Sequence, residues 1–272
     1  MTPETPTTSA DTSEREQEMH VRVLGCSGGV TRTQSGVSFL VEGRVGLDAG
    51  SLASGLSIEE QNGIEAVLVS HSHLDHVNDL GALADTRLQQ GGDVLPIHCL
   101  DETRAALQQH FFNDVLWPDF AQLPSDDSPT IAYRRVAPEE GFEVAGLRVL
   151  AVPVDHSVPS CGFLLGRTQY TLAYSGDTGP TERFWQVVAS EPAVRTLITE
   201  VSFPNRMEEL AGLSGHLTTA TFAREIEKLA PRSDLRILVY GLKPSFADEI
   251  AAEVRALPFD VELVEPDSTF NA

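Results

Sequence analysis

Four potential metal ligands lie close together in the segment HSHLDH, residues 71–76. Imidazole nitrogens and carboxylate oxygens suit zinc, and they also suit manganese and iron. Alternate side chains of an extended backbone point the same way, so His71 and His73 can face one metal ion. Asp75 and His76 follow in the next turn and can face a second ion. Structural zinc sites are usually rich in cysteine, and no cysteine lies near this segment, so the pattern favours an open, catalytic site.

Two residues further along the chain are candidates to complete the metal site. His156 follows the strand-like segment LRVLAVPV, and Asp177 lies between glycines in SGDTG. Glycines let the backbone bend, so the carboxylate of Asp177 can turn inwards. Alone, each residue is typical of an ordinary loop or turn. Together with the histidine cluster, both become candidate ligands.

The elements that must position these residues alternate between strands and helices. IEAVLVSH is a nearly continuous apolar run, typical of a strand buried on both faces, and it ends at the histidine cluster. Further strands are expected from His20 onwards and between residues 131 and 174, with helices near 78–88, 218–230 and 245–256. Two strand-rich halves, each followed by helices, predict an α/β fold in which two sheets are covered on their outer faces. We expect one domain, residues 20–272, after a disordered tail, residues 1–19.

The balance of charge limits the partners of this chain. It carries 40 acidic and 19 basic residues, a formal net charge of −21. Such a surface repels phosphate backbones, so no nucleic-acid partner is expected. The negative net charge does not exclude a small anionic substrate, because bound metal ions can reverse the electrostatic field at the site.

The cysteines and the hydropathy pattern bear on the compartment. Three separated cysteines, an odd number, indicate free thiols in a reducing compartment. There is no secretory signal and no apolar run of membrane-spanning length, so we expect a cytoplasmic protein without a membrane partner. The sequence leaves oligomerisation open.

The order HxHxDH, then a single histidine, then a strand-end aspartate resembles the metallo-β-lactamase superfamily. Later segments are similar to those of the class II cyclic-nucleotide phosphodiesterases, and the match runs from about residue 20 to the C-terminus. These segments are FFNDVLWPD (111–119), SGDTGP (175–180), EVSFP (200–204), SGHLT (214–218) and LKPS (242–245). The resemblance implies a single-domain αββα sandwich, the metallo-β-lactamase fold. It also implies a two-metal site that hydrolyses a 3′,5′-cyclic nucleotide, with cyclic AMP as the expected substrate, to the nucleoside 5′-monophosphate.

The resemblance also assigns ligands to two zinc ions, with Asp177 bridging them. Its first ion would be held by His71, His73, His156 and Asp177, and its second by Asp75, His76 and Asp177. Asp48 matches the buried acid that supports the ligands in this superfamily. One position departs from the family. Gly241 stands where the family has a histidine ligand, two residues before the Lys-Pro pair, so the second site lacks a ligand.

The catalytic residues expected from the resemblance are Asp75, Glu200 and His216. His216 is the candidate general acid for the leaving ribose oxygen, and Glu200 could orient its ring and raise its pKa. Asp75 could orient the attacking hydroxide as well as bind metal. Another interpretation of His216 is that it only caps the helix expected near Thr218. Four other side chains have two interpretations each. Lys243 either binds a phosphate oxygen of the substrate or is a solvated surface lysine. Phe112, Trp117 and Phe203 either stack on the base of the substrate or pack in the core.

Three other functions stay open at this point. One is an RNA nuclease of the same fold, against which the net charge argues. Another is a different small-molecule hydrolase, such as a thioesterase or lactonase. The last is a non-catalytic metal-binding protein with a degraded second site, for which Gly241 is the main support.

Overall fold

The structure of the chain, a computed structural model, describes residues 18–229 and 232–272. The expected tail lies outside these residues except for its last two. Met19 is fully buried, and its backbone exchanges two hydrogen bonds with Ala272. The described chain therefore closes on itself, with its first and last residues paired at the same sheet edge.

The N-terminal half, together with the last strand of the chain, builds a seven-stranded sheet that mixes antiparallel and parallel pairs. Its N-terminal strands pair antiparallel, and the strands from β3 onwards pair in parallel. In spatial order the strands are β16 (Thr269–Asn271), β1 (His20–Gly25), β2 (Ser38–Val41), β3 (Val45–Leu47), β4 (Ala66–Leu68), β5 (Leu95–Cys99) and β8 (Ile131–Arg135). Two helices contribute apolar residues to the cluster on one face of this sheet, α4 (Leu80–Gln90) and α5 (Asp101–His110), and the short helix α2 (Ile58–Asn62) contacts α4.

The C-terminal half builds a second seven-stranded sheet. In spatial order its strands are β15 (Glu262–Leu263), β14 (Arg236–Tyr240), β13 (Thr196–Glu200), β12 (Leu172–Tyr174), β11 (Ser160–Gly166), β10 (Leu147–Val154) and β9 (Gly141–Val144). Strands β12 to β15 run parallel. Apolar residues of α6 (Arg183–Ser190), α8 (Thr219–Ile226) and α9 (Ala247–Arg255) pack on one face of this sheet.

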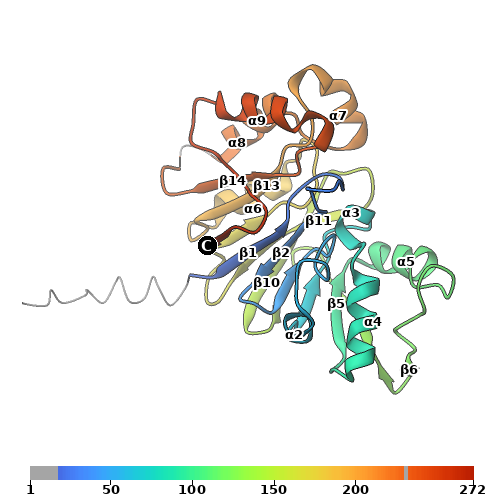
Figure 1. Cartoon of the computed structure of the whole chain (residues 1–272). Coiled ribbons are helices and arrows are strands. Elements are labelled where there is room, and N and C mark those ends of the chain that lie inside the picture. Colours follow the sequence, from blue (N-terminus) through green and yellow to red (C-terminus); the bar gives the residue numbers. More distant parts are fainter. Residues whose placement is uncertain (1–17, 230–231) are drawn as a thin grey trace, which may run out of the picture.

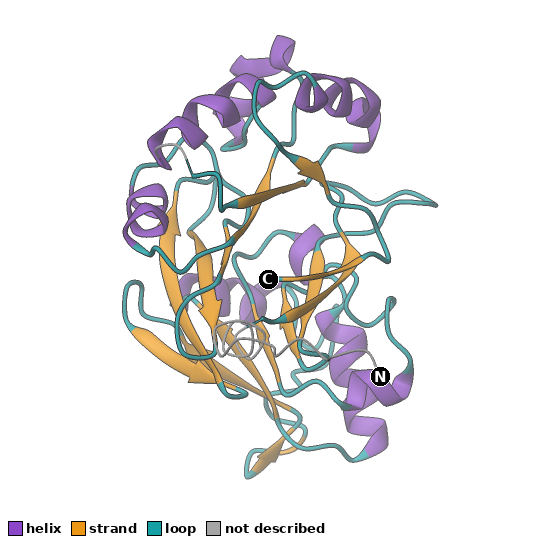
Figure 2. Ribbon diagram, turned by 90° about the vertical axis from the view of Figure 1, so that its left-hand side faces the viewer, coloured by secondary structure: helices purple, strands orange, loops and turns teal. Residues whose placement is uncertain are grey.

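The two sheets face each other, and helices lie on the outside of both (Figures 1 and 2). Between the sheets lies one apolar cluster with members from both, among them Phe39 and Leu68 from the first and Phe163 and Ile198 from the second. This arrangement is the αββα sandwich that the sequence predicts, so the fold class is confirmed. Within the described ranges, no helix combines the length and apolarity that crossing a membrane requires.

Short elements connect the layers at the edge that carries the histidine cluster. They are α3 (Leu74–Val77), the 3-10 turns η1 (Asn205–Met207) and η3 (Pro244–Phe246), and α7 (Glu208–Ser214), whereas a third 3-10 turn, η2 (Glu227–Leu229), precedes the start of β14. A small hairpin, β6 (Pro124–Ser125) with β7 (Ser128–Pro129), lies away from both main sheets.

Two helix expectations differ from the structure in their bounds. The helix expected near 78–88 runs from Leu80 to Gln90, and Asp75 and His76 lie in the separate single turn α3 rather than in an irregular turn. The helix expected near 218–230 ends at residue 226 and continues as the 3-10 turn η2.

Candidate metal and catalytic centre

Strands from both sheets deliver the candidate residues to one edge of the sandwich. His71 follows β4 of the first sheet, whereas His156 follows β10 and Asp177 follows β12 of the second. Glu200 is the last residue of β13. The carboxyl ends of parallel strands meet at the same edge of a sheet, which is why residues far apart in sequence converge here.

Six side chains form three overlapping groups of potential metal ligands. Within each group the ligand atoms lie within 4.8 Å of one another. The groups are His71, His73 and His156; His71, His76 and Asp177; and His156, Asp177 and His216. Five of the six predicted ligands are therefore together, and His216 joins them. Asp75 belongs to none of the three groups, although its charge acts on His73.

Hydrogen bonds to the outer nitrogens orient two of the imidazoles. Nδ1 of His76 lies 2.7 Å from Oδ2 of Asp48, and Nδ1 of His156 lies 2.7 Å from the carbonyl oxygen of Gly215. A ring nitrogen that donates to these acceptors leaves Nε2 unprotonated and available as a metal ligand.

Two buried nitrogens are suited to bind a positive group. Nε2 of His71 and Nε2 of His76 have no hydrogen-bond partner among the described residues. Nε2 of His76 lies 3.2 Å from Oδ1 of Asp177, but not in hydrogen-bond geometry. Burying unpartnered polar atoms costs free energy unless something binds them. A divalent ion between these atoms would satisfy them, so the residues present fit a metal.

The electrostatics divide the imidazoles into two sets. Burial lowers the pKa of His71 well below its usual value, and it also lowers the pKa of His73 and of His156. These three rings are neutral near pH 7, the form that binds metal. His76 differs. Burial opposes its charge, but Asp177 and Asp48 together raise the pKa of His76 well above the usual value.

Asp48 is buried beneath the histidines, as the resemblance implies. Its carboxylate accepts hydrogen bonds from the backbone N–H and the hydroxyl of Ser70, at 2.7 and 2.8 Å, and from the hydroxyl of Tyr174 at 2.5 Å. No sequence signal indicated the contribution of Tyr174, because its position resembles that of any other residue of a buried strand. Tyr240 reaches the site in the same way, with its hydroxyl 3.4 Å from Oδ1 of Asp177.

Glu200 and His216 form a buried pair beside Asp177. Nδ1 of His216 lies 2.7 Å from Oε1 of Glu200, which also accepts the backbone N–H of Thr178 at 3.1 Å. Burial opposes the charge of His216, but Glu200 raises its pKa above the usual value. His216 does not cap the following helix, because the hydroxyl of Thr218 accepts from the N–H of Thr221 there.

Gly241 lies at the end of β14 with a conformation that favours glycine. Its φ is +83°, its N–H donates to the carbonyl of Cys26 at 2.8 Å, and its carbonyl accepts from the hydroxyl of Ser202 at 3.1 Å. A Cβ built here would lie 3.3 Å from Cβ of Glu200. The backbone has adapted to the glycine, so a histidine cannot be added without strain.

The remaining side chains named from the sequence have different surroundings. Phe112 is buried among core aromatics, and the indole of Trp117 fills the space beside Gly81. Phe203 is buried against His216, with ring centroids 5.7 Å apart, and Nζ of Lys243 lies over the Phe203 ring, 5.4 Å from its centroid. Of these aromatics, Phe203 is the one in contact with the candidate catalytic histidine.

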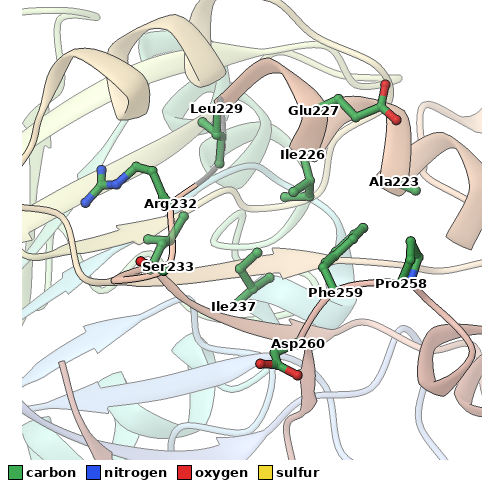
Figure 3. A pocket seen from close by; sticks show the side chains of 11 residues that line it. Ala223, Ile226, Glu227, Leu229, Arg232, Ser233, Ile237, Pro258, Phe259 and Asp260 are labelled. Carbon is green, nitrogen blue, oxygen red and sulfur yellow. The ribbon is translucent and has the colours of Figure 1, made fainter.

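A cavity of about 630 Å³ lies elsewhere, beside α8 and the start of β14 (Figure 3). Its lining includes Ile226, Ile237 and Phe259, and none of the candidate site residues. It adjoins the beginning of β14, whereas Gly241 follows the end of that strand. The candidate centre is therefore not in this cavity.

The fold and the site can be compared with known proteins. A family model described as a beta-lactamase superfamily domain matches residues 47–237. The chain is 26% identical to a probable 3′,5′-cyclic-nucleotide phosphodiesterase of Yersinia pestis over 83% of this chain and 78% of that protein. It is 28% identical to a 3′,5′-cyclic-nucleotide phosphodiesterase of Aliivibrio fischeri over 82% of this chain and 80% of that protein. It is also 26% identical to a ribonuclease Z of Mycobacterium sp. (strain KMS), covering 84% of each chain.

Solved structures show the same fold. Unliganded yeast PDE1 superimposes with a TM-score of 0.80 at 19% identity, covering 93% of this chain and 99% of that one. The metallo-beta-lactamase fold protein YhfI of Bacillus subtilis gives a TM-score of 0.74 at 17% identity, and the match covers 94% of this chain and 100% of that one. The chain belongs to the metallo-β-lactamase superfamily and is a hydrolase of that superfamily. Its resemblance to the class II cyclic-nucleotide phosphodiesterases is confirmed by these relatives.

Proposed function

We propose that this chain is a metal-dependent phosphodiesterase that hydrolyses a 3′,5′-cyclic nucleotide to the nucleoside 5′-monophosphate. Cyclic AMP is the substrate that we expect. The observation that carries the proposal is the position of the Glu200–His216 pair directly beside the ligand group of His156 and Asp177. A proton donor next to a metal centre is what cleavage of a phosphodiester requires. The phosphodiesterase names of two relatives support the same substrate class.

The residues fit one metal ion better than a second. His71, His73, His156 and Asp177 would hold the first ion, and zinc suits this set of nitrogen and oxygen ligands, as do manganese and iron. Asp75, His76 and Asp177 would hold the second. A bound ion lowers the pKa of water to roughly 7 and neutralises charge on the phosphoryl oxygens.

The second position has two disadvantages. An ion there competes with a proton on His76, because the pKa of that ring is raised, and Gly241 offers no side chain. We therefore expect the first site to fill before the second.

His216 acts on the leaving group. As the bond between water oxygen and phosphorus forms and the bond from phosphorus to the ribose O3′ breaks, the protonated ring gives the proton on Nε2 to O3′. Glu200 holds Nδ1, which fixes the ring and favours the protonated form. The lowered pKa of the first-ion ligand His71 and the raised pKa of His216 agree with these two roles, because a ligand must be neutral and an acid must hold a proton. Asp75 is proposed to orient the attacking water.

A ribonuclease is the main competing function, since several relatives carry the name ribonuclease Z. The net charge of −21 opposes a long polyanion more than a small one. A cyclic nucleotide substrate and three free, buried cysteines also agree with a cytoplasmic enzyme.

The test is a turnover assay with metal analysis on one preparation. Purified protein is supplied with zinc or manganese and offered cyclic AMP, cyclic GMP and a precursor tRNA. We expect release of the 5′-monophosphate and no cleavage of the RNA. Cleavage of the tRNA without turnover of either cyclic nucleotide would replace the proposal with the ribonuclease function. A metal-loaded protein inert towards all three would point to another hydrolase or to a non-catalytic protein.

A further inference from the structure

Among the residues that the structure describes, Lys243 is a positive charge without an acidic partner in a strongly acidic protein. The chain has 40 acidic residues and only two lysines. The other lysine, Lys228, bonds to the carboxylates of Glu182 and Glu225. Within residues 18–229 and 232–272, Lys243 makes no ion pair, and its ammonium donates only to the carbonyl of Gly28, at 3.2 Å. An ammonium has three donors, so two of them stay free.

The position of Lys243 is fixed by neutral groups. Its Nζ lies 5.4 Å from the centroid of the Phe203 ring, in a cation–π contact. The loop that supplies the Gly28 carbonyl is pressed against the end of β14, because a Cβ at Gly28 would lie 2.3 Å from the carbonyl oxygen of Gly241. The N–H of Gly28 also donates to the carbonyl of Leu242 at 3.3 Å. The side chain is thus half-buried and held in place while its charge stays uncompensated.

The same contacts bring Lys243 close to the catalytic pair. The ring of Phe203 contacts both, because its centroid lies 5.7 Å from that of His216 and 5.4 Å from Nζ of Lys243. The charge of Lys243 also acts to lower the pKa of His216, against the larger effects of Glu200 and Asp177. Lys243 follows Gly241 by two residues, so it lies at the sheet edge where the second metal position is a ligand short.

We propose that Lys243 binds a non-bridging oxygen of the phosphoryl group and makes the site select anionic phosphodiesters. The inference rests on the proposed function for its substrate class. An ammonium held beside the centre supplies positive charge at the side where Gly241 provides no ligand. It interacts with an anionic diester or with the product phosphate, but only weakly with a neutral ester.

Binding of inorganic phosphate to the metal-loaded protein, measured by calorimetry, tests this without turnover. Lys243→Met keeps the apolar stem on Phe203 and removes the charge, and we expect its Kd for phosphate to rise about tenfold or more. Lys243→Arg should retain most of the affinity. Arg255→Gln is the matched control, because Arg255 is an exposed cation at the far end of α9, and its affinity should equal that of the wild type. Metal content and melting temperature of each variant are measured alongside.

Equal phosphate affinity in Lys243→Met and the wild type, at equal metal content, would overturn the inference. The KM and kcat for cyclic AMP separate it from the proposed function. If Lys243→Met turns over cyclic AMP with the KM of the wild type, the inference about Lys243 is wrong and the proposed function is supported. Weakened phosphate binding in a protein that turns over no cyclic nucleotide supports the Lys243 site and removes the proposed substrate.

Discussion

Nδ1 of His216 lies 2.7 Å from Oε1 of Glu200, and both side chains are buried beside Asp177. The two residues come from different elements, the end of β13 and the loop before α8. Oε2 of Glu200 has no hydrogen-bond partner among the described residues, so the carboxylate is positioned by His216 and the Thr178 N–H alone. A buried carboxylate that holds one imidazole nitrogen fixes which nitrogen faces the substrate.

Removing the imidazole of His216 should lower kcat much more than metal content. We expect His216→Ala to lose about 10²–10⁴-fold in kcat, because the leaving oxygen then departs without a proton. A nitrophenyl phosphodiester needs no proton on its leaving group, so its turnover should be largely retained. If loss of metal accounts for the whole defect, His216 is a ligand, as its place beside His156 and Asp177 would then indicate.

The charge of Glu200 should set the titration of His216. The groups facing this ring are Glu200, Asp177, His156 and Lys243. In metal-free protein the pKa of His216 should lie above 6.5, and Glu200→Gln should lower it, as measured by NMR of the imidazole. Because the folded pKa is raised, the pair stabilises the fold below the pKa of the unfolded chain, and this contribution is lost as pH rises through the folded value. An unchanged titration in Glu200→Gln would contradict the assignment.

Metal binding should depend on the first histidine pair. We expect His71→Ala with His73→Ala to abolish retention of zinc after dialysis, because two of four ligands to the first ion are lost. His110→Ala is the control, since His110 is exposed on α5 and should leave the metal content unchanged. Metal analysis by mass spectrometry measures both. Full zinc content in the double variant would disprove the ligand assignment.

The backbone at Gly241 should resist a side chain. Gly241→Ala should lower the free energy of unfolding by about 1–2 kcal/mol, because φ is +83° and the new Cβ would crowd Glu200. Gly212→Ala is the control, since Gly212 lies in α7 with open space around it. That substitution should raise stability by roughly 0.5–1 kcal/mol. Denaturant unfolding distinguishes them, and equal stability of Gly241→Ala and the wild type would show that a histidine could be restored there.

Glu225 should be a strong contributor to stability outside the site. Its buried carboxylate accepts from Nε1 of Trp185 at 2.6 Å, from the N–H of Thr181 at 2.9 Å, and from Lys228. Glu225→Ala leaves these donors unpartnered and should cost about 3 kcal/mol or more. Glu208→Ala breaks an exposed ion pair with Arg224 and should cost about 1 kcal/mol or less. Denaturant unfolding measures the free energy of unfolding of both variants. Similar losses in the two would contradict the prediction that burial of Glu225 makes its contacts more stabilising.

The sequence by itself determined the chemical character of the centre. HSHLDH places four donors within six residues at the end of an apolar strand, and that local spacing identifies a metal site without knowledge of the fold. Strand periodicity predicted two layers of sheet, because alternation and apolar runs are local properties. The later motifs carried the resemblance to the phosphodiesterases.

Only the tertiary structure decided which of these residues meet. Asp75 belongs to the most recognisable motif, yet it lies outside all three ligand groups, whereas His216, 141 residues from it in sequence, belongs to one of them. Asp48 is held by Ser70 of the same half of the chain and by Tyr174 of the other half, and the types of these two residues gave no signal of this. Burial acts to lower the pKa of both His156 and His216, and the bonded carboxylate of Glu200 raises only that of His216 above its usual value, although both are single histidines in loops. Such contacts depend on the packing of one sheet on the other, which sequence spacing does not encode.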